Sequence, residues 1–159
     1  MRALLIAAGL VVVDAFWLNQ GFVALLFGLG VIFVGLPRAF LPRFKAVRSQ
    51  KLINVGVYLS AVVLVFALNR AQQRLAANRG EELVAAVKAF HGKYQRYPES
   101  LNALVPEFIA NVPPAKYTMT YSQFSYIKTD TNATLYYTEV PPFGRRAFVF
   151  SRGTWGRFD

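Results

Sequence analysis

The chain has 159 residues, of which 55% are hydrophobic, and its mean hydropathy of +0.33 is high for a water-soluble domain. It has no cysteine, which excludes a disulfide framework, a thiolate nucleophile and a cysteine metal site. The formal net charge of +10 would suit nucleic acid, but most of this net charge flanks apolar segments, so we predict a lipid bilayer as partner and no nucleic acid.

The apolar residues gather in the first half of the chain. Residues 3–36 contain one charged side chain, Asp14, and residues 52–68 contain none, whereas charges recur through 70–159. We predict transmembrane helices over about 3–18, 21–36 and 52–68, each near the shortest length that crosses a bilayer. The expected domains are therefore a transmembrane region, residues 1–68, and an extracytoplasmic α+β domain, residues 69–159.

Asp14 lies inside the first predicted span, where a charged group is costly and needs a partner. Asn19-Gln20-Gly21 predicts a tight turn between the first two spans, and Pro37 predicts the end of the second. Four residues separate Asp14 from the turn, so we expect it to reach the interface or to make an intramembrane polar contact with Asn19 or Gln20. The alternative is a proton or ion pathway, for which no second charged residue is present in the spans.

The predicted loop 38–51 carries basic side chains that determine topology. If all three segments span, this loop and Arg2 lie on one side, which the positive-inside rule assigns to the cytoplasm, and residues 70–159 lie outside. Arg70, Arg74 and Arg79 oppose this assignment, so an inverted topology stays open. The topology-determining residues of the loop are Arg38, Arg43, Lys45, Arg48 and Lys51.

A corner at Tyr97-Pro98 divides the next region into two amphipathic helices. The first continues from the third span, with a break at Asn78-Arg79-Gly80 as the alternative, and ends at about Tyr97. The second begins at Pro98 and is closed by Pro113-Pro114. The apolar stripes that predict these helices are Leu83, Val87, Phe90 and Tyr94 in the first, and Leu101, Leu104, Val105 and Phe108 in the second.

Short aromatic and β-branched runs follow and predict an antiparallel sheet, with turns at 130–132 and 141–144 and Trp155 at the end of the sheet. A helix packed on such a sheet is sufficient for a small domain. The expected strands are Tyr117–Tyr121, Phe124–Lys128, Leu135–Val140 and Ala147–Ser151.

The order of these features resembles that of a known family. A membrane helix that continues as an amphipathic helix, a Y-P-x-S-L-x-x-L-x-P corner at Tyr97–Pro106 and an aromatic sheet ending in S-R-G-T-W at Ser151–Trp155 resemble the periplasmic half of type IV pilins and type II secretion pseudopilins. The resemblance covers residues 52–159 at most. It implies a pilin-like fold in the bacterial inner membrane, with the C-terminal domain in the periplasm.

The family's processing signal is absent. Gly21-Phe22 imitates the prepilin-peptidase junction, but Gln20 precedes it and Leu26 occupies the glutamate position. The resemblance therefore implies an accessory protein resident in the membrane, one that interacts with pilin-like subunits or with the assembly machinery of a type IV pilus or related secretion system. The alternative function is a membrane-anchored periplasmic ligand-binding or sensory module.

The sequence offers no convergent set of catalytic groups. His91 is the only histidine, and Glu81 and Glu82 are adjacent, so their side chains point about 100° apart on a helix. The glycines at 28, 30 and 35 lie in an apolar span, where they would permit close helix packing. We predict no enzymatic activity, no cofactor and no metal site.

The candidate partner surface combines arginine with aromatic side chains, a composition typical of interfaces. Arg145 and Arg146 are expected on a loop beside Phe143, and Arg152 near Trp155. The alternative is a solvated turn. The candidate residues are Phe143, Arg145, Arg146, Arg152 and Trp155.

Overall fold

The structure, a computed structural model, describes residues 1–158 as two compact units. Unit 1 comprises Met1–Ala71 together with Thr118–Thr120, and unit 2 comprises Gln72–Tyr117 and the chain from Tyr121 onward. The division falls after Ala71, whereas the boundary placed from the sequence follows residue 68. With helices and one antiparallel sheet, the architecture is α+β.

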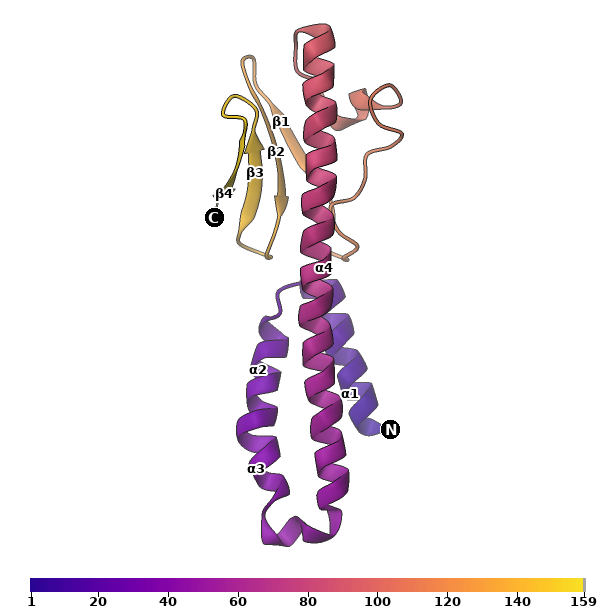
Figure 1. Ribbon diagram of the computed structural model, residues 1–159, viewed down its shortest axis with the longest axis vertical. Coiled ribbons are helices and arrows are strands. Elements are labelled where there is room, and N and C mark those ends of the chain that lie inside the picture. Colours follow the sequence, from indigo (N-terminus) through magenta and orange to yellow (C-terminus); the bar gives the residue numbers. More distant parts are fainter. Residues whose placement is uncertain (159) are drawn as a thin grey trace. The chain divides into compact units, whose positions relative to one another are not determined.

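Unit 1 is helical (Figure 1). The turn predicted at Asn19-Gln20-Gly21 is confirmed, because Asn19 (φ 53°) and Gly21 (φ 75°) both have left-handed backbones. The helices are α1 (Arg2–Val11), the π-helix η1 (Val12–Leu18), α2 (Phe22–Gly30), the π-helix η2 (Val31–Gly35), α3 (Leu36–Ala39), the 3₁₀-helix η3 (Pro42–Val47) and the first part of α4 (Arg48–Tyr94).

The predicted end of the second span at Pro37 is wrong, because the helix continues through Pro37 to Ala39. The chain becomes extended at Leu41 (φ −62°, ψ 139°), the residue before Pro42. A proline disfavours helical geometry in the residue before it, so Pro42 ends this helix and Pro37 does not. The segment predicted as a loop, 38–51, therefore contains the end of α3, η3 and the start of α4.

Two helical segments of the described chain, Phe22–Ala39 and Pro42–Tyr94, are long and apolar enough to cross a membrane by length and composition. The first predicted span corresponds to α1 and η1, Arg2–Leu18, and is shorter than either. Three transmembrane helices therefore stay a prediction.

Small side chains hold the helices of unit 1 together. The inner residues are Ala7, Leu10, Ala15, Ala24, Ala61 and Val65. A Cβ atom at Gly28 would lie 3.4 Å from Val62, an ordinary van der Waals contact, and one at Gly30 would meet no atom within 4 Å, so the helix packing does not depend on these glycines. Large apolar side chains point outward instead, among them Phe33 (73% exposed) and Val63 (68%). An apolar exterior of this kind fits contact with lipid chains or with other proteins.

In unit 2, the second part of α4 packs on one face of a four-stranded antiparallel sheet (Figure 1). Alternate residues of β2, namely Ala133, Leu135 and Tyr137, are buried, as expected when one face of a sheet covers a core. The strands, in spatial order, are β1 (Ser125–Lys128), β2 (Ala133–Thr138), β3 (Arg145–Val149) and β4 (Thr154–Phe158).

The strand predicted over Tyr117–Tyr121 is wrong. The Tyr117 N–H donates to the Gln72 side chain (2.9 Å), and Tyr121 has a left-handed backbone (φ 55°), which a strand does not accommodate. The fourth strand is β4, in which Trp155 pairs with Phe148. The sheet is therefore antiparallel as predicted, but it is displaced along the chain toward the C-terminus.

The corner between the predicted helices also differs from expectation. Helix α4 runs unbroken through Asn78–Gly80 and ends at Tyr94. The second helix is reduced to one 3₁₀ turn, η4 (Leu101–Leu104), because Pro106 disfavours helical geometry at Val105. Leu101 and Leu104 are buried as the apolar stripe predicted, whereas Val105 is 37% exposed.

Candidate functional site

The five candidate partner residues do not form one surface. Phe143 is 74% exposed on the β2–β3 connection, and Arg145 begins β3 close by. Arg152 lies in the β3–β4 turn, at the opposite end of β3. The structure thus places Phe143 and Arg145 at one end of the sheet and Arg152 at the other.

Arg146 and Trp155 lie on the face of the sheet that packs against α4. The Arg146 guanidinium is 5.6 Å from the centre of the Trp155 ring, and its Nη1 is 3.8 Å from Glu139 Oε1. The Trp155 indole N–H donates to Glu81 Oε1 (2.7 Å). The expectation that Arg145 and Arg146 lie on a loop is wrong, because strand pairing with Phe158 and Arg157 begins β3 at Arg145.

The opposite face of the sheet, the outer sheet face, bears Ile127, Thr134, Tyr136, Arg145, Val149 and Phe158. These residues line a shallow hollow of about 320 Å³. Ile127 (53% exposed) and Phe158 (45%) are large apolar side chains on this surface. Sequence reasoning missed it because Phe158 lies beyond the predicted strands.

Asp14 is fully buried at the α1–α2 connection. Its carboxylate accepts the backbone N–H groups of Gly21 (2.7 Å), Ala24 (2.7 Å) and, more distantly, Gln20 (3.4 Å). The contact expected with Gln20 is thus made only by its backbone N–H, and the shorter contacts are with Gly21 and Ala24. The first N–H groups of a helix have no helical acceptor, and the carboxylate accepts that of Ala24 at the start of α2.

The same connection is tied to α4 by a second buried polar contact. The Asn19 side-chain amide donates to Asn69 Oδ1 (2.9 Å) and to the Ala15 carbonyl (3.1 Å). Asn69, only 6% exposed, is a site residue that sequence reasoning missed, since a single polar residue at the end of an apolar run resembles a solvated helix surface. Asp14 and Asn69 thus both hydrogen-bond to residues of the turn.

The basic residues at 38–51 make structural contacts that leave their charges without acidic partners. Arg48 donates to the Ala39 (3.3 Å) and Phe40 (3.4 Å) carbonyls at the end of α3, and the Lys51 ammonium is 3.6 Å from the centre of the Phe44 ring. The salt bridges found within residues 1–158 all lie in unit 2. Among the first 80 residues, Asp14 is the only acid.

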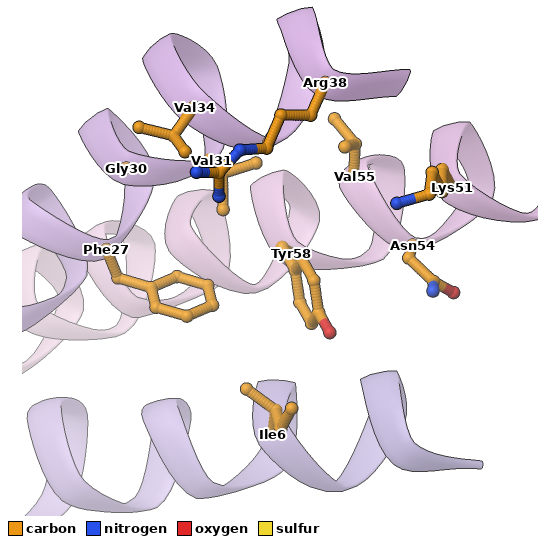
Figure 2. A pocket seen from close by; sticks show the side chains of 11 residues that line it. Ile6, Phe27, Gly30, Val31, Val34, Arg38, Lys51, Asn54, Val55 and Tyr58 are labelled. Atoms are coloured by element: carbon orange, nitrogen blue, oxygen red, sulfur yellow. The ribbon is translucent and has the colours of Figure 1, made fainter. Parts of the chain in front are cut away.

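A pocket of about 500 Å³, the helix pocket, opens beside these cations (Figure 2). Its apolar walls include Ile6 from α1, Phe27 from α2 and Val55 from α4. Polar groups are added by Arg38 from α3 and by Lys51, Asn54 and Tyr58 from α4. All of these residues belong to unit 1.

Lys116 is a buried cation in unit 2, with 1% of its surface exposed. Its Nζ donates to the Glu139 backbone carbonyl (2.6 Å). Burial away from water disfavours the charged amine and lowers the pKa of Lys116 to about 8, while the nearby Glu139 carboxylate opposes this change. The sequence showed only a lysine after two prolines, which gave no sign of burial.

Lys116 should make the stability of unit 2 depend on alkaline pH. The folded pKa of about 8 is below the ordinary value of 10.5, so the unfolded chain binds more protons between these values. Folding stability should therefore rise by about 2 kcal/mol from about pH 7 to about pH 9.5. Urea unfolding in micelles, followed by Trp155 fluorescence in a Trp17→Phe background, measures this rise. The same rise in Lys116→Met would contradict it.

The polar residues considered for catalysis contact aromatic side chains or lie apart from one another. The His91 ring stacks 4.4 Å from Tyr97, and Glu81 accepts the indole N–H of Trp155. Within residues 1–158, no three His, Cys, Asp or Glu side chains lie close enough to hold a metal ion. The absence of enzymatic activity stays a prediction.

No protein-family model, no curated protein and no solved structure matches the chain. A helical N-terminal region followed by a small antiparallel sheet is not specific to pilins. The resemblance to type IV pilins and pseudopilins therefore stays a prediction.

Proposed function

We propose that the chain is a non-enzymatic accessory protein of the bacterial inner membrane, whose unit 2 binds pilin-like subunits or the assembly machinery of a type IV pilus or related secretion system. The observation that supports this function best is the outer sheet face, where Ile127, Phe158 and Arg145 are exposed together. Aromatic and aliphatic side chains beside an arginine are the usual composition of an energetically important protein interface.

In this proposal unit 1 holds the protein in the membrane with three spans, and unit 2 lies in the periplasm. Two segments with the length and composition of spans support the placement, and so do the unpaired cations at 38–51, which favour the cytoplasmic side. A compartment-sensitive reporter fused to the C-terminus measures it. A cytoplasmic signal would overturn the periplasmic assignment.

The outer sheet face also bears on the alternative function, a ligand-binding or sensory module. Its hollow of about 320 Å³ is at the lower limit of volumes typical for small-molecule sites. A broad strand surface with large exposed side chains suits a protein partner better. A small molecule that shifts the melting temperature of the full chain, with no protein bound, would favour the alternative.

Arg145→Glu should weaken capture of pilin-like subunits by about tenfold, because it reverses the charge at the edge of an apolar contact surface. Arg145 is exposed, so the substitution should leave the fold unchanged. Arg146 is unsuitable for this test, since it contacts Glu139 and Trp155. Co-purification of the full-length protein with tagged pilin-like subunits from the host membrane measures capture.

Arg152→Glu is the matched control for this experiment. It makes the same charge change on an exposed arginine at the other end of β3, and capture should stay at the wild-type level. Equal losses in both variants would indicate a general charge effect and not a site. Unchanged capture by Arg145→Glu would remove the outer sheet face as the interface.

A further inference from the structure

The helix pocket combines an apolar interior with cations at one end. Val31 and Val55 are buried in its wall, and the Phe27 and Tyr58 rings meet edge to face with centres 5.3 Å apart. A Cβ atom at Gly30 would meet no atom within 4 Å, so the pocket is open at this position. Its volume of about 500 Å³ is in the range typical of small-molecule sites.

Figure 2 shows how the polar groups are arranged around this interior. Arg38 reaches toward the pocket from α3 and Lys51 from α4, while Ile6 points into it from α1. Asn54 and Tyr58 extend from α4 on the side that faces α1, with the Tyr58 hydroxyl turned toward Ile6. Guanidinium, ammonium, amide and phenol groups all donate hydrogen bonds, so the polar lining of the pocket is suited to an anion.

No acidic side chain of unit 1 compensates these cations. Asp14, the only acid before Glu81, is buried at the α1–α2 connection, where its oxygens accept backbone N–H groups. Lys51 has the Phe44 ring as a neighbour, which stabilises a cation without neutralising it. The charge at the mouth of the pocket is therefore available to an anionic ligand.

We propose that the helix pocket binds one anionic phospholipid, with an acyl chain against Ile6, Phe27 and Val55 and the phosphate between Arg38 and Lys51. A free phosphate would leave the apolar walls empty, and a neutral lipid would leave the cations unpaired. Basic pockets between membrane helices are an established kind of site for anionic headgroups. This inference rests on the membrane placement in the proposed function.

Lipid binding to the full-length protein in micelles tests the site, with native mass spectrometry to count bound lipids. Wild type should retain one phosphatidylglycerol in preference to phosphatidylcholine. Arg38→Gln with Lys51→Gln should reduce phosphatidylglycerol retention by about tenfold, since two charge-assisted contacts are lost. Excess inorganic phosphate should not displace the lipid, and displacement would overturn the role of the apolar walls.

Two further variants separate the pocket from general charge. Arg43→Gln with Lys45→Gln removes the same charge from the same segment without touching the pocket lining, and should change retention little. Gly30→Phe keeps every charge but fills the open part of the pocket, and should reduce retention. Equal losses in the two charge variants, or full retention by Gly30→Phe, would overturn the proposed site.

Different results would contradict the lipid site and the membrane placement. Release of the wild-type protein from membranes by alkaline carbonate would overturn the placement, and the lipid site with it. Retention in the membrane without a preference for phosphatidylglycerol would overturn the lipid site alone. The capture experiment with Arg145→Glu concerns unit 2 and is independent of both results.

Discussion

Asp14→Asn is expected to lower the free energy of unfolding at the α1–α2 connection by about 3 kcal/mol. The Asp14 carboxylate accepts two N–H groups at 2.7 Å, from Gly21 and Ala24. An asparagine has one acceptor oxygen, so its amide N–H₂ would face one of these donors. A buried donor then loses its partner, and the charge-assisted character of the other bond is lost as well.

Hydrogen–deuterium exchange of the full-length protein in nanodiscs measures this effect locally. The amides of residues 20–24 should exchange about 100-fold faster in Asp14→Asn, the factor that corresponds to about 3 kcal/mol. Val13→Ala is the matched control, because Val13 is adjacent but 38% exposed. Equal exchange in wild type and Asp14→Asn would show that the carboxylate does not hold the turn.

Gly80→Leu is expected to destabilise unit 2 by about 3 kcal/mol, through overpacking against the sheet. A Cβ atom at Gly80 would lie 3.0 Å from Trp155 Cη2 and 3.2 Å from its Cζ2, and 3.6 Å from Phe124. A leucine would therefore displace the Trp155 ring and break its hydrogen bond to Glu81. This loss exceeds the gain of about 1 kcal/mol in helix propensity.

Gly92→Ala on the same helix is the matched control, with the opposite sign. A Cβ atom at Gly92 would meet nothing within 4 Å, so the substitution should stabilise the helix by up to about 1 kcal/mol. Urea unfolding in micelles, monitored by Trp155 fluorescence in a Trp17→Phe background, compares the two. If Gly80→Leu were as stable as wild type, the close approach of helix and sheet at this point would be refuted.

Gly80 also shows why the course of α4 was not decided by the sequence. Asn78-Arg79-Gly80 has the spacing of a helix start and suggested a break as one alternative, but the glycine provides space for Trp155. In the sequence, a glycine that breaks a helix cannot be distinguished from a glycine that leaves space for a neighbouring ring. The ring that needs the space comes from β4, far along the chain.

An antiparallel sheet was predicted, but one of its strands was missed because strand formation depends on a partner elsewhere in the chain. Leu135 and Phe148 lie in runs whose β-branched and aromatic content predicts strands, and both are in paired strands. Tyr117–Tyr121 has a similar alternation but no neighbouring strand to pair with. Glycine is unfavourable in a strand, so β4 was not predicted from a segment that contains Gly153 and Gly156. This strand depends on β3 for its hydrogen bonds.

The candidate sites depended even more on tertiary structure. Arg145 and Arg146 are adjacent, yet β pairing sends one to the outer sheet face and the other to the inner face. Arg38 and Lys51 were recognised for their charge, but their meeting at one pocket depends on the packing of α3 beside α4. Composition identified the residue types, whereas the grouping of their side chains required the helices and strands to be placed.

The membership of Thr118–Thr120 in unit 1 has a consequence for biosynthesis. The Met119 N–H donates to the Phe16 carbonyl (2.8 Å) and the Thr120 hydroxyl to the Trp17 carbonyl (2.6 Å), at the end of η1. Trp17 is synthesised 103 residues before Thr120. The last carbonyls of η1 therefore lack these partners until a segment that follows α4 has been synthesised, so the contacts form late in folding.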